Sequence, residues 1–172
     1  LRRCRDKRVT VYKPEKYHLP APAACGTPPV VVGMGPGGLF AALVLAKCGL
    51  RPIVLERGEA VEQRRETVAR FWRDGTLNTE SNVQFGEGGA GTFSDGKLFT
   101  RTKDANSNFV LKTFVEHGAS EDTIYLKRPH IGSDVLPKVA ESMRRSIEAQ
   151  GGEFLFGTAV KSLIIENGVA KG

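Results

Sequence analysis

The sequence has few cysteines and no long apolar run. Its three cysteines, Cys4, Cys25 and Cys48, do not form a CxxC motif. We therefore expect no disulfide framework and a reducing compartment. No apolar run reaches the roughly 18–20 residues of a membrane helix, and no secretory signal is present. We therefore expect a cytoplasmic protein, or a plastid one if the source is eukaryotic, without a membrane partner.

Metal-binding and hydrolase signatures are also missing. The three histidines, His18, His117 and His130, lack metal-ligand spacing with one another and with the cysteines. No Ser-His-Asp set, HExxH motif or P-loop occurs. The sequence therefore predicts no metal site and leaves the catalytic residues unknown.

The positive charge lies at the beginning of the chain. The net charge is +6, of which residues 1–20 carry +5 and the remaining 152 residues +1. The segment after Pro20 is rich in proline. We interpret residues 1–28 as a linker from a missing upstream region, and we expect no nucleic-acid partner for the globular part.

Strand and helix patterns alternate after residue 28. A β-branched run at 30–32, a helix over 39–48 and a strand at 52–56 predict a parallel α/β sheet with strands buried on both faces. Helices are expected over 59–74 and 106–117, the second capped by Asn106, and in a third segment capped by Asp134. A short strand is expected at 124–126.

Two strands, at 153–156 and 159–166, follow these helices, and an Asn-Gly turn starts a return strand. We expect 29–172 to be a partial FAD-binding domain with a Rossmann-like fold. Its long helical insertion, 59–150, follows the second strand, and the chain stops before a β-meander is complete. The C-terminal half of the same protein is expected to be the missing partner.

The first strand leads into the pattern Gly33-x-Gly35-x-x-Gly38. In a dinucleotide-binding turn, Gly33 permits the tight exit from the strand, Gly35 lets a pyrophosphate approach the backbone, and Gly38 lets helix and sheet pack closely. Pro36 and Gly37 lie in the same turn and are expected to contact the cofactor. The N-terminus of the helix that follows would offer N–H groups and a partial positive charge to phosphates.

Glu56 ends the second strand, 23 positions after Gly33. A carboxylate there can accept hydrogen bonds from ribose hydroxyls and disfavours a 2′-phosphate. The next strand of the nucleotide fold is expected only at Glu153, after the insertion. Because FAD needs protein beyond the nucleotide fold for its isoalloxazine end, this long interval favours FAD over NAD.

The stretch GMGPGGLFAALVLAKCG…VLERG resembles the N-terminal FAD motif of glutathione-reductase and hydroxylase type flavoproteins. Residues 29–172, through FWRDGTLNTESNVQFGEGGAGTFSDGKLFTR and RPHIGSD, resemble the bacterial and plastid family described as uncharacterised FAD-dependent dehydrogenases. The resemblance implies that Gly33, Gly35 and Gly38 hold the pyrophosphate and Glu56 the ribose. It further implies Arg57 near the adenine and the Val160 backbone at the adenine edge. The family's second FAD motif, a Gly-Asp pair, is absent from this sequence.

The span ESNVQFGEGGAGTFSDGKL, residues 80–98, is unusually rich in glycine. We expect Gly89 and Gly91 to bring backbone close to the flavin end of the cofactor. Lys97 could lie near the flavin or a substrate anion, or be solvated after an Asp-Gly turn. Ser94, Asp95 and His130 are more simply structural.

These features predict an FAD-dependent oxidoreductase, a dehydrogenase or reductase in which the flavin transfers hydride and NAD(P)H is a candidate electron donor. The substrate is unknown. Two alternatives stay open: a non-catalytic flavin-binding accessory module, and an NAD-dependent dehydrogenase.

Overall fold

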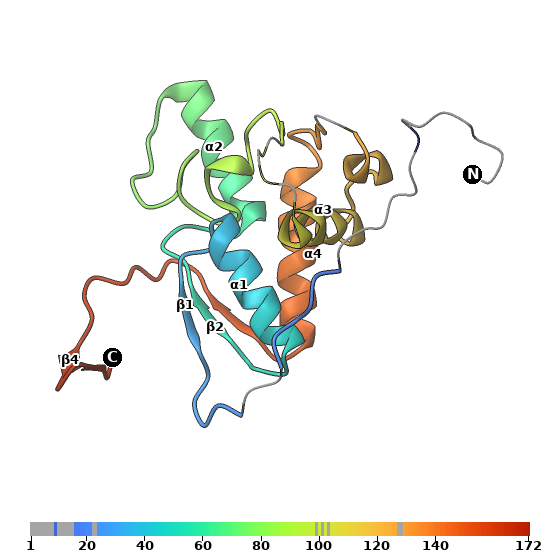
Figure 1. Ribbon diagram of the computed structural model, residues 1–172. Helices are drawn as coiled ribbons and strands as arrows, with labels where there is room; N and C mark the ends of the chain where they lie inside the picture. The colour runs from blue at the N-terminus through green and yellow to red at the C-terminus, as the bar shows by residue number, and fades with distance from the viewer. Residues whose placement is uncertain are drawn as a thin grey trace.

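A parallel three-stranded sheet and four α-helices form the body of the protein. The computed structural model describes residues 9, 16–21, 24–98, 100, 102, 104–126 and 129–172. The described elements follow one another as β1 (Val30–Val32), α1 (Pro36–Lys47), β2 (Ile53–Leu55), α2 (Val61–Asp74), η1 (Gly89–Gly91), α3 (Ala105–Glu116), η2 (Glu121–Ile124), α4 (Leu136–Ala149), β3 (Glu153–Leu155), β4 (Ile165–Glu166) and β5 (Val169–Ala170). The α/β class with a parallel sheet is confirmed (Figure 1).

Strand β2 lies at the centre of the sheet, between β1 and β3. The register aligns Val31 with Val54 and Val54 with Phe154, so the carboxyl ends of the three strands lie at one edge. Helices α2, α3 and α4 lie in the chain between β2 and β3. This edge is therefore where the β1–α1 turn and the segments after β2 and β3 meet.

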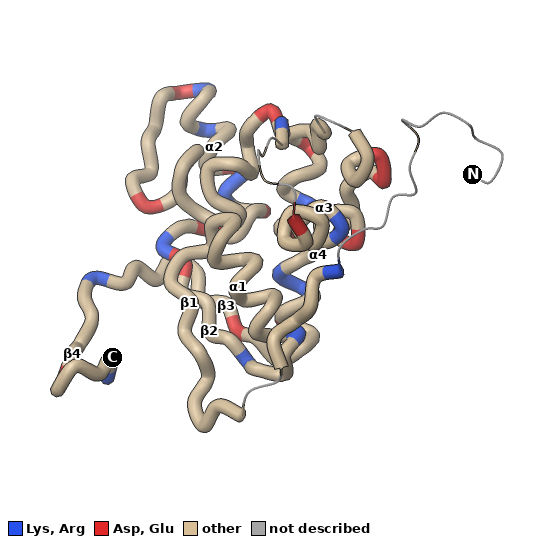
Figure 2. Tube along the Cα trace, viewed as in Figure 1, with Lys and Arg blue, Asp and Glu red and all other residues tan. Residues whose placement is uncertain are grey.

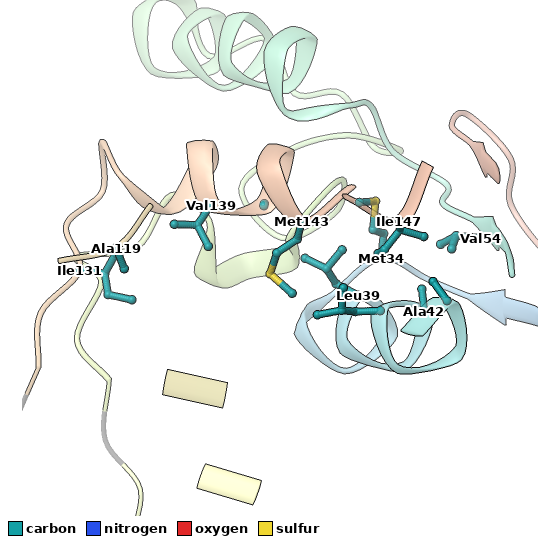
Figure 3. Close-up of a cluster of buried hydrophobic side chains, with 12 residues drawn as sticks. Met34, Leu39, Ala42, Val54, Ala119, Ile131, Val139, Met143 and Ile147 are labelled. Carbon is teal, nitrogen blue, oxygen red and sulfur yellow. The ribbon is translucent and has the colours of Figure 1, made fainter. Parts of the chain in front are cut away.

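Helices α1 and α4 pack together against one face of the sheet (Figure 3). Met34 before α1, Leu43 on α1, and Met143 and Ile147 on α4 are fully buried around Val54 of β2. Burying each such side chain contributes about 1.5–3 kcal/mol, so this cluster stabilises the packing of α1 and α4 on the sheet.

The prediction that the strands are buried on both faces was wrong for β1, whose second face is exposed. Only Val31 of β1 packs against the core; Val30 and Val32 are 57% and 59% exposed. A run of three β-branched residues cannot show by itself how many faces are covered, because burial depends on elements distant in sequence.

Several predicted element ends were wrong by one to three residues. Helix α1 begins at Pro36 and not at residue 39, because the first turn includes Gly37 and Gly38, which are poor helix formers. Helix α3 is capped by Asp104, whose Oδ1 accepts from the Ser107 N–H at 2.8 Å, and not by Asn106. The N-cap of α4 is Val135 rather than Asp134, although Pro137 does lie in the first turn. Each segment has several polar residues near the helix start that could act as the N-cap. Sequence alone does not identify which residue begins the helix.

The strand predicted at 124–126 was also wrong, since that segment ends the 3₁₀ helix η2. Of the predicted strand at 159–166, the structure has only β4, Ile165–Glu166. It pairs only with β5, through a turn at Asn167 and Gly168 that was correctly predicted. The β4–β5 hairpin projects from the body (Figure 1).

Part of the segment predicted as a linker contacts the helices. The Tyr17 ring stacks on Phe109 of α3 with centroids 4.2 Å apart. Most of the basic residues of 1–20 lie outside the described residues, and Figure 2 shows charges of both signs over the remaining helices and loops. No helix in the described ranges is long and apolar enough to cross a membrane.

Candidate functional site

The turn between β1 and α1 is built from glycines with separate steric tasks. Gly33 leaves the strand with φ of +89°, and its N–H donates to the Leu55 carbonyl at 2.8 Å. A Cβ on Gly38 would overlap the Gly33 carbonyl oxygen. The close approach of the α1 backbone to the strand end therefore requires glycine at position 38.

Gly35 faces open space at the beginning of α1. It is the N-cap of the helix in extended conformation, and a Cβ built on it meets no atom within 4 Å. Pro36 follows in the first turn. The first N–H groups of a helix have no intrahelical acceptor and carry a partial positive charge, so this position suits an anion.

Glu56 joins the turn to the end of β2. The side chain is buried, its Oε2 accepts from the Met34 N–H at 2.6 Å, and its Oε1 accepts from the Gly58 N–H at 2.8 Å. Each oxygen of a carboxylate has about two acceptor positions. Glu56 thus fixes the turn and keeps acceptor capacity at the carboxyl edge of the sheet.

The glycine-rich span lies directly against this turn. The Gly88 N–H donates to the Met34 carbonyl at 2.8 Å. A Cβ on Gly89 would lie 3.1 Å from the Gly35 Cα and 3.2 Å from the Pro36 Cδ. The backbone around Gly89 therefore borders the space in front of Gly35.

A cavity of about 370 Å³ opens where these segments meet. Its volume lies within the usual range for ligand pockets. Three segments line it: the strand ends and first turn, the glycine-rich span, and the chain after β3. The lining residues are Val32, Gly33, Gly35, Leu55, Glu56, Arg57, Gln84, Phe85, Gly86, Gly89, Thr158, Ala159, Val160 and Lys161.

Arg57 and Phe85 form part of one wall. The Arg57 guanidinium lies 4.3 Å from the Phe85 ring centroid and pairs with Glu80, with Nη2 and Oε2 2.9 Å apart. Val160, on the segment after β3, lines the same cavity. Planar cationic and aromatic groups at this wall could contact the face of a flat ring.

The structure thus brings six of the predicted site residues to one cavity: Gly33, Gly35, Glu56, Arg57, Gly89 and Val160. Pro36, Gly37 and Gly38 belong to the adjoining helix start without lining it. Gly91 is exposed outside the lining.

Lys97 also lies outside the lining. Its Nζ pairs with Asp95 Oδ2 at 2.7 Å, an exposed contact whose hydrogen bond raises the pKa of Lys97. A β-bridge joins it to His130, which is exposed.

Sequence reasoning missed Arg64, a fully buried residue of α2. Its guanidinium donates to backbone carbonyls of the glycine-rich span, and burial lowers its pKa to about 10. Arg64 lies on the buried face of α2 with Val61 and Val68, three residues after one and four before the other. This helical spacing from two apolar residues was the sequence feature that could have indicated that Arg64 is buried.

Glu87 was missed as well. It is fully buried within the span; its Oε2 accepts from the Val61 N–H at 2.8 Å, and its Oε1 accepts from Arg144 Nε at 3.0 Å. Burial raises the pKa of Glu87, against the opposing effects of these two partners. Arg144 also pairs with Glu62, so the span is connected to both α2 and α4.

Comparison with known proteins finds no family model that matches. A protein of Clostridium beijerinckii named "Uncharacterized protein" is 52% identical over 140 residues, which cover 81% of this chain and 26% of that protein. The chain spans about a quarter of the length of the curated relative it matches.

Proposed function

We propose that this chain is the FAD-binding part of a flavin-dependent oxidoreductase with a Rossmann-like nucleotide fold. The observation that carries the proposal is the cavity in front of Gly35, bounded by the start of α1 and by buried Glu56. An anion site and a hydroxyl acceptor lie together at the carboxyl edge of a parallel sheet, where dinucleotides bind in α/β proteins.

The residues present fit such a ligand. The backbone at Gly35 and the first turn of α1 would receive the pyrophosphate, and the remaining acceptor positions of Glu56 would receive the ribose hydroxyls. Arg57 and Val160 would border the adenine. These assignments use the open space at Gly35 and the remaining acceptor capacity of Glu56.

Bound FAD would supply hydride or electron transfer, and the protein would supply binding and orientation. The Lys97–Asp95 pair is exposed and lies outside the cavity lining. This is consistent with a protein that supplies binding while the flavin carries the reaction. NAD(P)H as electron donor, and a dehydrogenase or reductase activity, are parts of the same proposal. The substrate class stays unassigned.

NAD is the second candidate, favoured by the same cavity. FAD and NAD share an adenosine diphosphate part, and the lining residues described above address that part alone. Extraction of the cofactor followed by chromatography separates the two. A bound flavin supports the proposal, and bound NAD without flavin overturns it.

The proposal is tested with Gly35→Val in the protein expressed from its complete reading frame. The variant should fold, because position 35 has an extended backbone and open space, but its affinity for FAD should fall by about tenfold or more through obstruction of the phosphate position. Fluorescence titration with FAD measures the affinity and circular dichroism the fold.

Gly26→Val is the matched control, since a Cβ at Gly26 also meets nothing within 4 Å and lies outside the cavity lining. It should bind FAD as the wild type does. A folded wild-type protein that takes up no FAD, or a Gly35→Val variant with unchanged affinity, contradicts the proposal.

A further inference from the structure

Arg64 makes an unusual set of contacts for a helical arginine. The side chain is fully buried, and within the described residues its guanidinium donates only to main-chain oxygens. The acceptors are the carbonyls of Asn82 at 2.9 Å, Val83 at 3.1 Å, Glu87 at 2.6 Å and Gly89 at 2.8 Å.

The carbonyls of Asn82, Val83 and Glu87 belong to a segment without a helix or strand, and that of Gly89 belongs to the first residue of η1. Residues 82–88 form bends and turns, and Gly86 and Gly88 have positive φ. Carbonyls that are buried or partly buried outside regular structure still need donors. The planar, multiply donating guanidinium of Arg64 supplies four from a single rigid group, which a lysine cannot do.

The fit between Arg64 and the segment is close. A Cβ on Gly86 would lie 2.5 Å from the Arg64 Cδ, so the arginine stem passes directly beside the Gly86 backbone. The guanidinium also lies 5.0 Å from the Phe93 ring centroid. Glu56 and Glu87 stabilise its charge, which keeps Arg64 protonated at neutral pH although burial lowers its pKa to about 10.

The segment that Arg64 holds is also one side of the nucleotide cavity. Gln84, Phe85, Gly86 and Gly89 line it, and the Gly88 N–H is bonded to Met34 in the β1–α1 turn. Displacing 82–89 would therefore widen the space in front of Gly35 and break the hydrogen bond between Gly88 and the β1–α1 turn.

We propose that Arg64 is a positioning residue that fixes residues 82–89 as the second wall of the nucleotide site before the ligand binds. The inference rests on the proposed function for the identity of the ligand. It adds that the affinity for the ligand depends on Arg64, which lies outside the cavity lining and acts through its hydrogen bonds to backbone carbonyls.

The test uses Arg64→Met and Arg64→Lys in the protein expressed from its complete reading frame, with Arg65→Met as the matched control on the exposed side of α2. FAD affinity is measured by fluorescence titration. Amide hydrogen exchange is measured for residues 82–91 and, as an internal reference for global unfolding, for α1.

We expect FAD affinity to fall by about a hundredfold in Arg64→Met and about tenfold in Arg64→Lys, which keeps the charge and part of the donor set. Arg65→Met should match the wild type. Exchange should accelerate in 82–91 but not in α1. A merely structural arginine would change both segments together and would not give partial recovery with lysine.

The wild-type protein provides a measurement that does not depend on whether the variants fold. Without FAD, residues 82–91 should already be protected from exchange to a degree comparable with α1; free exchange there overturns the inference. Affinity within about twofold of wild type in Arg64→Met also overturns it. If the wild type binds no FAD, the proposed function fails, and the exchange measurement still decides whether the wall is fixed.

Discussion

Gly37 and Gly38 are adjacent, yet the structure places them in opposite environments. A Cβ at Gly38 would overlap the Gly33 carbonyl oxygen, whereas a Cβ at Gly37 meets nothing within 4 Å. Gly38→Ala should therefore destabilise the protein by about 1–3 kcal/mol. Gly37→Ala should be neutral or stabilising by about 0.4–1 kcal/mol, through the entropy of the unfolded chain.

Urea unfolding of the two variants and the wild type measures these differences. Equal stabilities for Gly37→Ala and Gly38→Ala would show that helix α1 can move away from the strand end at little cost. The close packing inferred for this turn would then be incorrect.

At the scale of residues, the sequence indicated groups whose role depends on local backbone, and it missed groups whose role depends on distant partners. Gly33 and Gly38 have the steric roles expected from their spacing. Arg64 resembles any charged helical residue in the sequence, because the carbonyls that enclose it lie 18–25 positions away. Its position on the apolar face of α2 was the single local indication.

Among the elements, α3 and α4 are joined by a hydrogen bond that involves a titratable histidine. His117, the C-cap of α3, lies with Nδ1 3.1 Å from the Ser142 Oγ of α4. Burial lowers the pKa of His117; nearby Lys47 acts in the same direction and Glu116 against it.

Because the pKa of His117 is lower in the folded state than its ordinary value of 6.5, the unfolded chain binds the proton first as pH falls. The stability that His117 contributes is present above pH 6.5 and is lost as pH falls through the folded pKa. The loss should be below about 1 kcal/mol, since water screens a half-exposed ring.

His117→Gln removes the titration and should flatten this part of the pH dependence. The free energy of unfolding in urea, measured between about pH 5 and 7.5 for both proteins, gives the difference due to position 117. Parallel curves for the variant and the wild type would contradict this assignment.

At this scale, the sequence predicted the existence and order of β1, α1, β2, α2, α3, α4 and β3. The apolar periodicity of the helices and the glycines at their ends are local signals. The pattern at 124–126 was misassigned because three apolar residues fit either a strand or a 3₁₀ turn. The exposed face of β1 could not be predicted, since it depends on which elements pack there.

Across the whole molecule, the cavity combines three segments that are far apart in the chain: the end of β1, the glycine-rich span and the residues after β3. The spacing of Gly33, Gly35 and Glu56 indicated the first of these segments, the end of β1, as part of a binding site. The glycine content of 80–98 indicated close backbone approach, and Gly89 does approach the β1–α1 turn. Its partner there is Gly35, a contact that only the tertiary structure identifies.

The cavity leads to a prediction for residues 1–172 expressed alone. Its volume of about 370 Å³ lies near the lower end for ligand pockets. In the proposed function, its lining contacts the adenosine diphosphate part of the dinucleotide. We therefore expect ADP and FAD to bind with dissociation constants within about tenfold of each other, because the flavin end adds few contacts. FAD retention through dialysis should be weak or absent.

Isothermal titration with ADP, FAD and FMN measures this, after circular dichroism has established that the helices are formed. FMN, which lacks the adenosine, should not bind, and Gly35→Val should weaken ADP and FAD equally because both place phosphate in front of Gly35. A stoichiometric yellow complex that survives dialysis, or FMN binding as strong as FAD binding, would contradict the prediction. Either result would mean that residues 1–172 also hold the flavin end, so that the lining from Gln84 to Gly89 extends further along the cofactor than the adenosine diphosphate part.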